Sequence, residues 1–448
     1  MIPNDKIYKN IKFKKRLGFL KKSQTWSKKK IENYQLLKIR EIFRHVKNNV
    51  PFYIDYFKNK NIKESDIKSL NDIKIFPIVT KKIIQKRSKE FLIKNFKKKI
   101  FFNRTTGGST GTPLTIWSDL DHQIKDKANT KHYLKIFDLD LNKFNSVRIY
   151  GDKIKDKLVK KKIFWKKKNK TLVMSAYHLN HKNIDYYLQA IKKFKPIYIH
   201  SRASIIFTFA KLLYDLKIKI NLNLKYIFVD GECLNLGQRK LIQSAFNTRI
   251  INIYGHTEGA LVGHPCKFSN FLHFMPQNGL IELLSNKNQK INKIGTKGNI
   301  IATGFNNKIM PLIRYKTGDI GVNGPNKCRC RRNYKILKEI EGREQDYVID
   351  KNGNPVPLAP AIFNYNDMDW KNIEEFKILQ SKKGKLKVLL QISRSRKQLA
   401  KKVLINTKNR LSKIFGNHFS LSVKKTDYLK KTSIGKYRYL DQKLRVNI

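Results

Sequence analysis

A loop rich in glycine and hydroxyl residues, TTGGSTGTP at residues 105–113, is the stretch with the clearest potential for chemistry. It lies between two strand-like segments, KIFFNR and LTIWS. The backbone N–H groups and hydroxyls of such a turn can surround a polyphosphate. The loop lacks the Walker spacing and G-x-G-x-x-G, and it contains no lysine. Alone, it indicates either a phosphate site that takes its positive charge from elsewhere or a simple connection between strands.

Five further motifs follow the loop in a fixed order. They are VDGE (229–232), YGHTE (254–258), LIRYKTGD (312–319), GREQD (342–346) and KKTSIGKYR (430–438). Together with the loop, this ordered set resembles the adenylate-forming superfamily of acyl-CoA synthetases and related ligases. FPIVTKK ahead of the loop and MPLIRYKTGD after it resemble the branch that contains phenylacetate–CoA ligases and capsule-biosynthesis proteins of the CapK type. The resemblance extends from about residue 75 to residue 440.

The resemblance implies an enzyme that activates a carboxylic acid with ATP. The acid attacks the α-phosphorus of ATP, pyrophosphate leaves, and the acyl-adenylate passes its acyl group to CoA or to an amine. The hydroxyls of the loop would hold the β- and γ-phosphates. The nucleotide-binding residues expected in the loop are Thr105, Thr106, Gly107, Gly108, Ser109, Thr110 and Gly111.

The later motifs carry the other expected roles. Glu258 matches the Mg²⁺ ligand, since a hard cation that bridges phosphates prefers carboxylate oxygen, and Thr257 beside it joins the catalytic set. Asp319 matches the carboxylate that binds the ribose hydroxyls. Lys436 matches the lysine that stabilises the pentavalent α-phosphate. The resemblance implies five further nucleotide-binding residues. Tyr254, beside Gly255, would stack on the adenine, and Gly231 and Glu232 would line the base. Arg343 would reach the nucleotide from near the hinge residue Asp346.

The sequence departs from the superfamily pattern at several positions. Thr112 stands where the phosphate loop usually has lysine or arginine, so Mg²⁺ and Lys436 are expected to supply the charge. Residues 200–204 differ from the usual turn beside the acyl pocket. Arg202 there is open to two interpretations, a partner for an acidic or sugar-linked substrate or a surface arginine. His256 is likewise interpreted as an acyl-pocket residue or a structural histidine.

Three of the four cysteines predict a metal site. Cys328 and Cys330 form a tight pair, and Cys266 and His273 lie upstream of it. Four such ligands suit tetrahedral Zn²⁺. Because Mg·ATP already supplies the electrophile, a structural site is expected rather than a catalytic one. His264 is an alternative ligand to His273, and isolated cysteines are the alternative to the whole site; Cys233 is interpreted as a buried residue.

Strand-like runs alternate with helical patterns in the middle of the chain, which favours an α/β fold with a largely parallel sheet. From about residue 279 the sequence is β-rich, and EGREQDYVIDKNGNPVPL (341–358) predicts a hairpin. The predicted architecture is a large multi-sheet N-terminal adenylation domain over residues 1–340. A small, mobile α+β C-terminal lid domain follows over residues 341–448.

Lysine dominates the composition of the 448-residue chain. There are 96 lysines and arginines against 33 acidic residues, a formal net charge of +63. No nucleic-acid-binding signature accompanies this charge, so no specific nucleic-acid partner is expected. The densest runs, at residues 158–170 and 95–102, indicate either a solvated surface or a face for nucleotides or anionic lipid. No apolar run could span a membrane and no secretory signal is recognisable, so the cytoplasm is expected.

Two alternatives to a ligase stay open from the sequence. The first is a nucleotide-binding relative without ligase activity, which the departures at Thr112 and residues 200–204 allow. The second is a basic accessory protein on a membrane surface. Glu258, Asp319 and Lys436 favour the enzyme, with ATP and Mg²⁺ as cofactors, CoA as an acceptor and Zn²⁺ as a structural ion.

Overall fold

The computed structural model describes residues 7, 9–105, 114–140, 143–232, 234, 236–343, 347–358, 372–392, 398–429 and 439–444, with the backbone alone for residues 236, 343, 355, 357 and 374. The chain divides into two compact units. The first unit comprises residues 1–140 and 253–340, and the second comprises residues 141–252 and 341–448. The chain passes between the units at residues 140–141, 252–253 and 340–341. The division into domains of residues 1–340 and 341–448 stays a prediction.

Helices open the first unit, and their limits follow from local signals. In α3 (Lys28–Asn49) the Ser27 side chain caps the first turn by accepting from the Lys30 N–H. Ile31, Ile39 and Phe43 recur at helical spacing and are buried. The helix ends where Pro51 begins the next one, since proline lacks the N–H that would continue α3. The other helices here are α2 (Ile11–Ser23), α4 (Pro51–Asn59), α5 (Lys81–Lys86), α6 (Leu120–Ile136) and the 3-10 helices Glu64–Asp66 and Leu70–Ile75.

The sheet of the first unit has the strand order β12-β13-β14-β15-β11-β10-β9, with β1 parallel to β14. A separate hairpin pairs β2 with β3, the strands on either side of the glycine-rich loop in the sequence. Strands β9 and β15 each have residues in both units. The strands are β1 (Val79–Thr80), β2 (Phe102–Thr105), β3 (Thr115–Ser118), β9 (Arg249–Gly255), β10 (Val262–His264), β11 (Leu272–Phe274), β12 (Gly279–Leu284), β13 (Lys297–Gly304), β14 (Tyr315–Asn323) and β15 (Lys335–Arg343).

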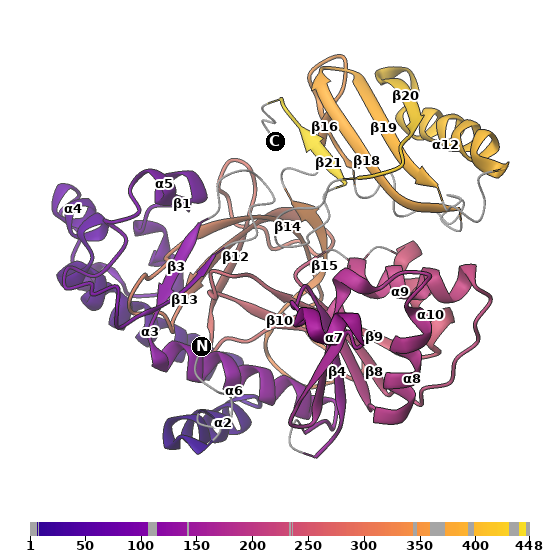
Figure 1. Cartoon of the computed structure of the whole chain (residues 1–448). Coiled ribbons are helices and arrows are strands. Elements are labelled where there is room, and N and C mark those ends of the chain that lie inside the picture. The colour runs from indigo at the N-terminus through magenta and orange to yellow at the C-terminus, as the bar shows by residue number, and fades with distance from the viewer. Residues whose placement is uncertain are drawn as a thin grey trace. The chain divides into compact units, whose positions relative to one another are not determined.

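The second unit contains the α/β part of the chain. Strands β8, β7, β4 and β6 are parallel neighbours in that order, and β5 is antiparallel at the edge. Helices α8, α9 and α10 pack their apolar faces against these strands around one core (Figure 1). The elements are β4 (Ser146–Tyr150), α7 (Asp156–Lys160), β5 (Trp165–Lys168), β6 (Thr171–Ser175), the 3-10 helix Ala176–His178, α8 (Ile184–Phe194), β7 (Tyr198–Arg202), α9 (Ala203–Asp215), β8 (Tyr226–Asp230) and α10 (Leu236–Phe246).

Residues after 346 have a sheet and a core of their own. The sheet order is β20-β19-β18-β21, and helix α12 packs Val403, Leu411 and Phe415 against it. The predicted hairpin is present as antiparallel strands β16 and β17. The elements are β16 (Tyr347–Ile349), β17 (Pro355–Pro357), β18 (Ile373–Lys382), β19 (Lys385–Ile392), α12 (Ala400–Phe415), the 3-10 helix Gly416–His418, β20 (Ser420–Lys425) and β21 (Leu440–Gln442).

Among the described residues, no helix has both the length and the apolar character needed to cross a membrane.

Candidate active site and metal centre

A β-bulge in strand β14 presents Asp319. The pairing of β14 with β13 shifts between Asn299 and Ile301, so that residues 317–319 lie outside the regular register. Gly318 adopts φ +80°, which favours glycine. The Thr317 hydroxyl donates to the Ile300 carbonyl at 3.1 Å and accepts from the Asp319 N–H at 3.1 Å. A bulge re-aims a side chain from its strand, and here that side chain is the predicted ribose ligand.

Asp319 and Tyr254 are in direct contact. The Tyr254 hydroxyl donates to Asp319 Oδ2 at 2.8 Å, although 65 residues separate the two in sequence. Tyr254 is held on β9, opposite Gly263 of β10, and Asp319 is only 7% exposed. The first unit therefore brings together the tyrosine of YGHTE and the aspartate of RYKTGD.

Glu258 lies in the turn after β9, which the Gly259 N–H closes by donating to the His256 carbonyl at 2.9 Å. Tyr315 donates its hydroxyl to Glu258 Oε1 at 2.7 Å, and His256 Nδ1 lies 3.3 Å from Oε2. Burial raises the pKa of Glu258, but the hydrogen bond and charge of His256, with the Tyr315 hydroxyl, outweigh it and lower the pKa to about 2. The carboxylate is ionised at neutral pH, as a Mg²⁺ ligand must be. His256, which the sequence places beside the acyl pocket or in a structural role, contacts Glu258.

The other predicted site residues lie elsewhere in the first unit, in the second unit, or outside the described residues. Thr105 ends strand β2, opposite Thr115, and Thr257 and Gly255 lie in the same segment as Glu258. Gly231 and Glu232 belong to the second unit. Arg343 ends β15, and its side chain is outside the described part of the structure. Residues Thr106, Gly107, Gly108, Ser109, Thr110, Gly111, Thr112, Cys233, Asp346 and Lys436 also lie outside the described residues.

In the second unit, Gly231 and Glu232 follow strand β8. Gly231 has φ +68°, a backbone conformation that favours glycine, and Arg202 Nη1 lies 2.7 Å from where a Cβ on Gly231 would be. The Ser204 N–H, at the start of α9, donates to Glu232 Oε2 at 2.9 Å. Glu232 therefore has a local role at a helix N-terminus, where a carboxylate is favourable.

The four side chains predicted to bind zinc lie together. One ligand atom from each of Cys266, His273, Cys328 and Cys330 falls within 4.8 Å of the others. Cys266 Sγ is 3.6 Å from Cys328 Sγ, and Cys330 Sγ is 3.3 Å from His273 Nε2. Tetrahedral Zn²⁺ with ordinary bond lengths separates two sulfur ligands by about 3.8 Å. The donor set and its spacing fit a zinc ion.

The surroundings of the cluster also suit a metal. The pKa of Cys330 is lowered to about 7 because the Cys266 thiol hydrogen-bonds its thiolate, while that contact and burial raise the pKa of Cys266 to about 12. His273 Nδ1 contacts the Phe271 carbonyl at 3.0 Å, which directs Nε2 towards the sulfurs. His264, the alternative ligand, instead contacts the Pro265 carbonyl through Nδ1 at 2.8 Å.

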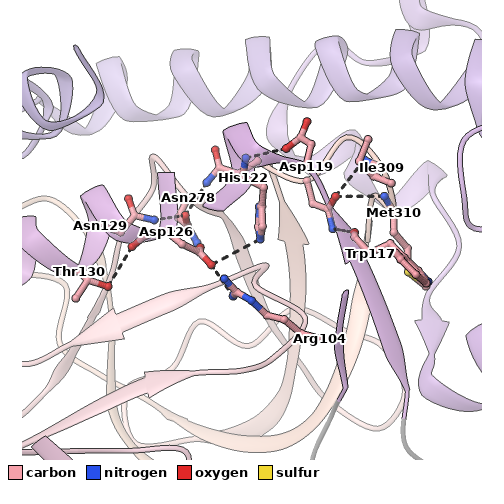
Figure 2. A network of polar contacts seen from close by, with 12 residues as sticks. Arg104, Trp117, Asp119, His122, Asp126, Asn129, Thr130, Asn278, Ile309 and Met310 are labelled. Atoms are coloured by element: carbon pink, nitrogen blue, oxygen red, sulfur yellow. Dashed lines mark hydrogen bonds and ion pairs between the residues drawn. The ribbon is translucent and has the colours of Figure 1, made fainter. Parts of the chain in front are cut away.

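Three polar residues near the turn that carries Glu258 were not identified from the sequence. They are Arg104, His122 and Asp126. Figure 2 shows their side chains converging between strand β2 and helix α6. Asp119 caps the start of this helix, and its Oδ1 accepts from the His122 N–H at 2.8 Å. The available signal was the His122–Asp126 spacing of four residues, which places both side chains on one helix face.

The fold is that of the adenylate-forming CoA ligases. A solved structure of 2-hydroxyisobutyryl-CoA ligase in the postadenylation state matches 94% of this chain and 91% of its own, with a TM-score of 0.73 at 16% identity. Anthranilate CoA ligase with anthranoyl-AMP matches 75% of this chain and 65% of its own, with a TM-score of 0.52 at 15% identity. The predicted fold class, a mixed α/β architecture with a large N-terminal part and a smaller C-terminal part, is confirmed.

Among curated proteins, the chain is similar to Protein CapK of Staphylococcus aureus. The two are 28% identical over 319 residues, which cover 69% of this chain and 67% of CapK. The phenylacetate-coenzyme A ligase of Aromatoleum evansii is 23% identical over 361 residues, 76% of each chain. No protein-family model matches the sequence. The resemblance inferred from the motifs, to phenylacetate–CoA ligases and CapK, is confirmed by these relatives.

Proposed function

We propose that this protein is an AMP-forming ligase that activates a carboxylic acid. A carboxylate oxygen attacks the α-phosphorus of ATP, the bond to the β-phosphate oxygen breaks, and pyrophosphate leaves. The acyl-adenylate then transfers its acyl group to the thiol of CoA or to an amine, and AMP leaves. The similarity to phenylacetate-CoA ligase and the fold shared with ligases crystallised with acyl-AMP and CoA support this reaction.

The convergence of two motifs in the first unit is the observation that carries the proposal. YGHTE supplies Tyr254 and Glu258, and RYKTGD supplies Tyr315 and Asp319, in two tyrosine–carboxylate pairs. Glu258 would hold Mg²⁺, which neutralises phosphate charge. Asp319 would accept hydrogen bonds from the ribose hydroxyls, with Tyr254 holding it in place.

The Glu258→Gln variant tests this assignment. Losing the anionic metal ligand removes a charge-assisted contact, so we expect pyrophosphate release to fall about 10- to 100-fold. The measurement is pyrophosphate release from Mg·ATP across a panel of carboxylic acids, with mass spectrometry of the bound acyl-adenylate.

Glu64→Gln is the matched control, because Glu64 is a surface carboxylate paired with Arg44 at 3.2 Å. Its activity should equal that of the wild type. A wild-type chain that binds ATP but releases no pyrophosphate with any acid would instead favour the nucleotide-binding alternative.

We also propose a place in surface-polysaccharide assembly, which the resemblance of the motifs to capsule-biosynthesis proteins of the CapK type implies, with an amine of a sugar or CoA as the acyl acceptor. The cytoplasm, where ATP and CoA are available, stays the expected location. We assign Cys266, His273, Cys328 and Cys330 to a structural Zn²⁺ that joins the loop between β14 and β15 to the segment around β11.

A second proposal concerns the basic surface around strand β5. This strand is the edge of its sheet, and residues 152–170 around it include only two acidic residues, Asp152 and Asp156. Edge lysines discourage strand pairing, but this density exceeds that need. The density instead fits contact with anionic lipid headgroups. The exposed lysines are Lys153, Lys155, Lys157, Lys160, Lys161, Lys162, Lys166, Lys167, Lys168 and Lys170.

Replacing Lys166, Lys167 and Lys168 by glutamine tests the lipid contact. Each lysine near an anionic surface contributes about 1 kcal/mol, so binding to phosphatidylserine vesicles should fall by roughly 100-fold. Co-sedimentation measures it, with zwitterionic vesicles as the control. Equal binding of the variant and the wild type, or a preference for DNA of equal charge, would contradict the proposal.

A further inference from the structure

Arg104 stands one residue before the end of strand β2. In the β2–β3 hairpin it pairs with Ile116, and Thr105 pairs with Thr115. Neighbouring residues of a strand point to opposite faces, so Arg104 and Thr105 diverge. The Arg104 side chain reaches towards helix α6 and is 41% exposed.

A carboxylate on α6 holds this guanidinium, and an imidazole on the same helix contacts the carboxylate. Arg104 Nη1 donates to Asp126 Oδ2 at 2.8 Å, and His122 Nε2 lies 3.8 Å from the same oxygen (Figure 2). His122 is 3% exposed and Asp126 is 21% exposed, so the support is more deeply buried than the arginine. The buried imidazole and the half-buried carboxylate limit where the guanidinium can lie.

The same histidine contacts the turn that carries Glu258. His122 Nε2 lies 2.9 Å from the position that a Cβ on Gly259 would take, and Gly259 has φ +70°. A residue larger than glycine at position 259 would collide with the buried His122 imidazole. A chain of close contacts thus joins Arg104, through Asp126 and His122, to the residue next to the predicted Mg²⁺ ligand.

We propose that Arg104 binds the outer phosphates of ATP, and that Asp126 and His122 are the residues that position it. ATP carries more negative charge than one Mg²⁺ neutralises, and the glycine-rich loop has Thr112 where a basic residue would help. A guanidinium has five N–H donors, of which a carboxylate engages at most two. The others can bind phosphate oxygens while the contact with Asp126 persists, and charge-assisted bonds of this kind are among the strong ones.

This inference rests on the proposed function. Measurements of nucleotide binding test the role of Arg104 and the proposed function separately. We expect Arg104→Ala to weaken binding of Mg·ATP about 10- to 100-fold, as loss of hydrogen bonds to a charged group does. Binding of AMP should change less than twofold, because the contact is with the outer phosphates. Isothermal titration calorimetry with ATP, ADP and AMP measures both effects. Arg104→Lys should fall between the wild type and Arg104→Ala.

Arg87→Ala is the matched control, since Arg87 is 43% exposed and also pairs with a carboxylate, Glu90. It should bind ATP as the wild type does. If Arg104→Ala also binds ATP as the wild type does, or loses ATP and AMP equally, the inference is wrong. A wild type that binds neither nucleotide would overturn the proposed function as well.

Asp126→Asn examines the positioning role. We expect it to weaken ATP binding severalfold and to leave AMP binding intact, since the amide still accepts from Arg104 but no longer as an anion. A thermal unfolding midpoint close to that of the wild type shows that the effect is not structural. An Asp126→Asn variant with unchanged selectivity for ATP over AMP would remove Asp126 from the proposal.

Discussion

Replacing Lys436 by alanine is expected to slow acyl-adenylate formation about 100- to 1000-fold, the loss seen when one donor to a transition-state charge is removed. The motif TSIGK implies that this ammonium binds the α-phosphate as it becomes pentavalent. Such a contact strengthens only in the transition state, so the dissociation constant for ATP should change little. Single-turnover pyrophosphate release and ATP titration, measured on the same preparation, separate the two quantities.

Lys424→Ala is the control for Lys436→Ala, because Lys424 is an exposed lysine of strand β20 in the same basic C-terminal region. It should keep the wild-type rate. If Lys436→Ala adenylates normally, the charge that the glycine-rich loop lacks comes from elsewhere, and Arg104 would be the first residue to examine. The double variant Lys436→Ala, Arg104→Ala distinguishes independent from shared roles.

The regular elements of the fold could be predicted because their patterns are local. Apolar spacing over residues 35–49 predicts a helix, and α3 is that helix. RIINIYG (249–255) predicts a strand, and β9 has the same bounds. The turn at Lys351–Gly353 predicts the β16–β17 hairpin, which is present. In each case the local pattern indicates the type of element, and packing against the rest of the fold supplies most of its stability.

The candidate site could be predicted only where a motif carries it. Tyr254 and Asp319 are named by their motifs, but their hydrogen bond depends on a bulge at Gly318, which no periodicity indicates. Arg104 and Asp126 lie 22 residues apart on a strand and a helix. Their contact depends on how α6 packs beside the β2–β3 hairpin. Lysine and arginine are so frequent in this chain that composition could not single out Arg104.

Removing zinc is expected to have the largest effect on stability. The four ligands come from segments up to 64 residues apart, so the metal would close long loops, and structural zinc supplies folding energy outright. We expect purified protein to contain one Zn²⁺ per chain. Cys330→Ser should lose it and lower the unfolding midpoint by roughly 10 °C, since each kcal/mol lost moves a unit of this size by about 2–4 °C.

Elemental analysis and thermal unfolding test the zinc site directly. Cys233→Ser is the control, since Cys233 is not among the four ligands, and it should keep its metal. A chelator selective for Zn²⁺ over Mg²⁺, used in excess Mg²⁺, should reproduce the effect of Cys330→Ser in the wild type and do nothing further in the variant.

A metal-free protein with an unchanged midpoint would mean that Cys266, His273, Cys328 and Cys330 are held together by packing alone. A zinc-depleted protein that unfolds early yet adenylates at low temperature would assign the ion to structure, because Mg²⁺ at Glu258 then suffices for the chemistry.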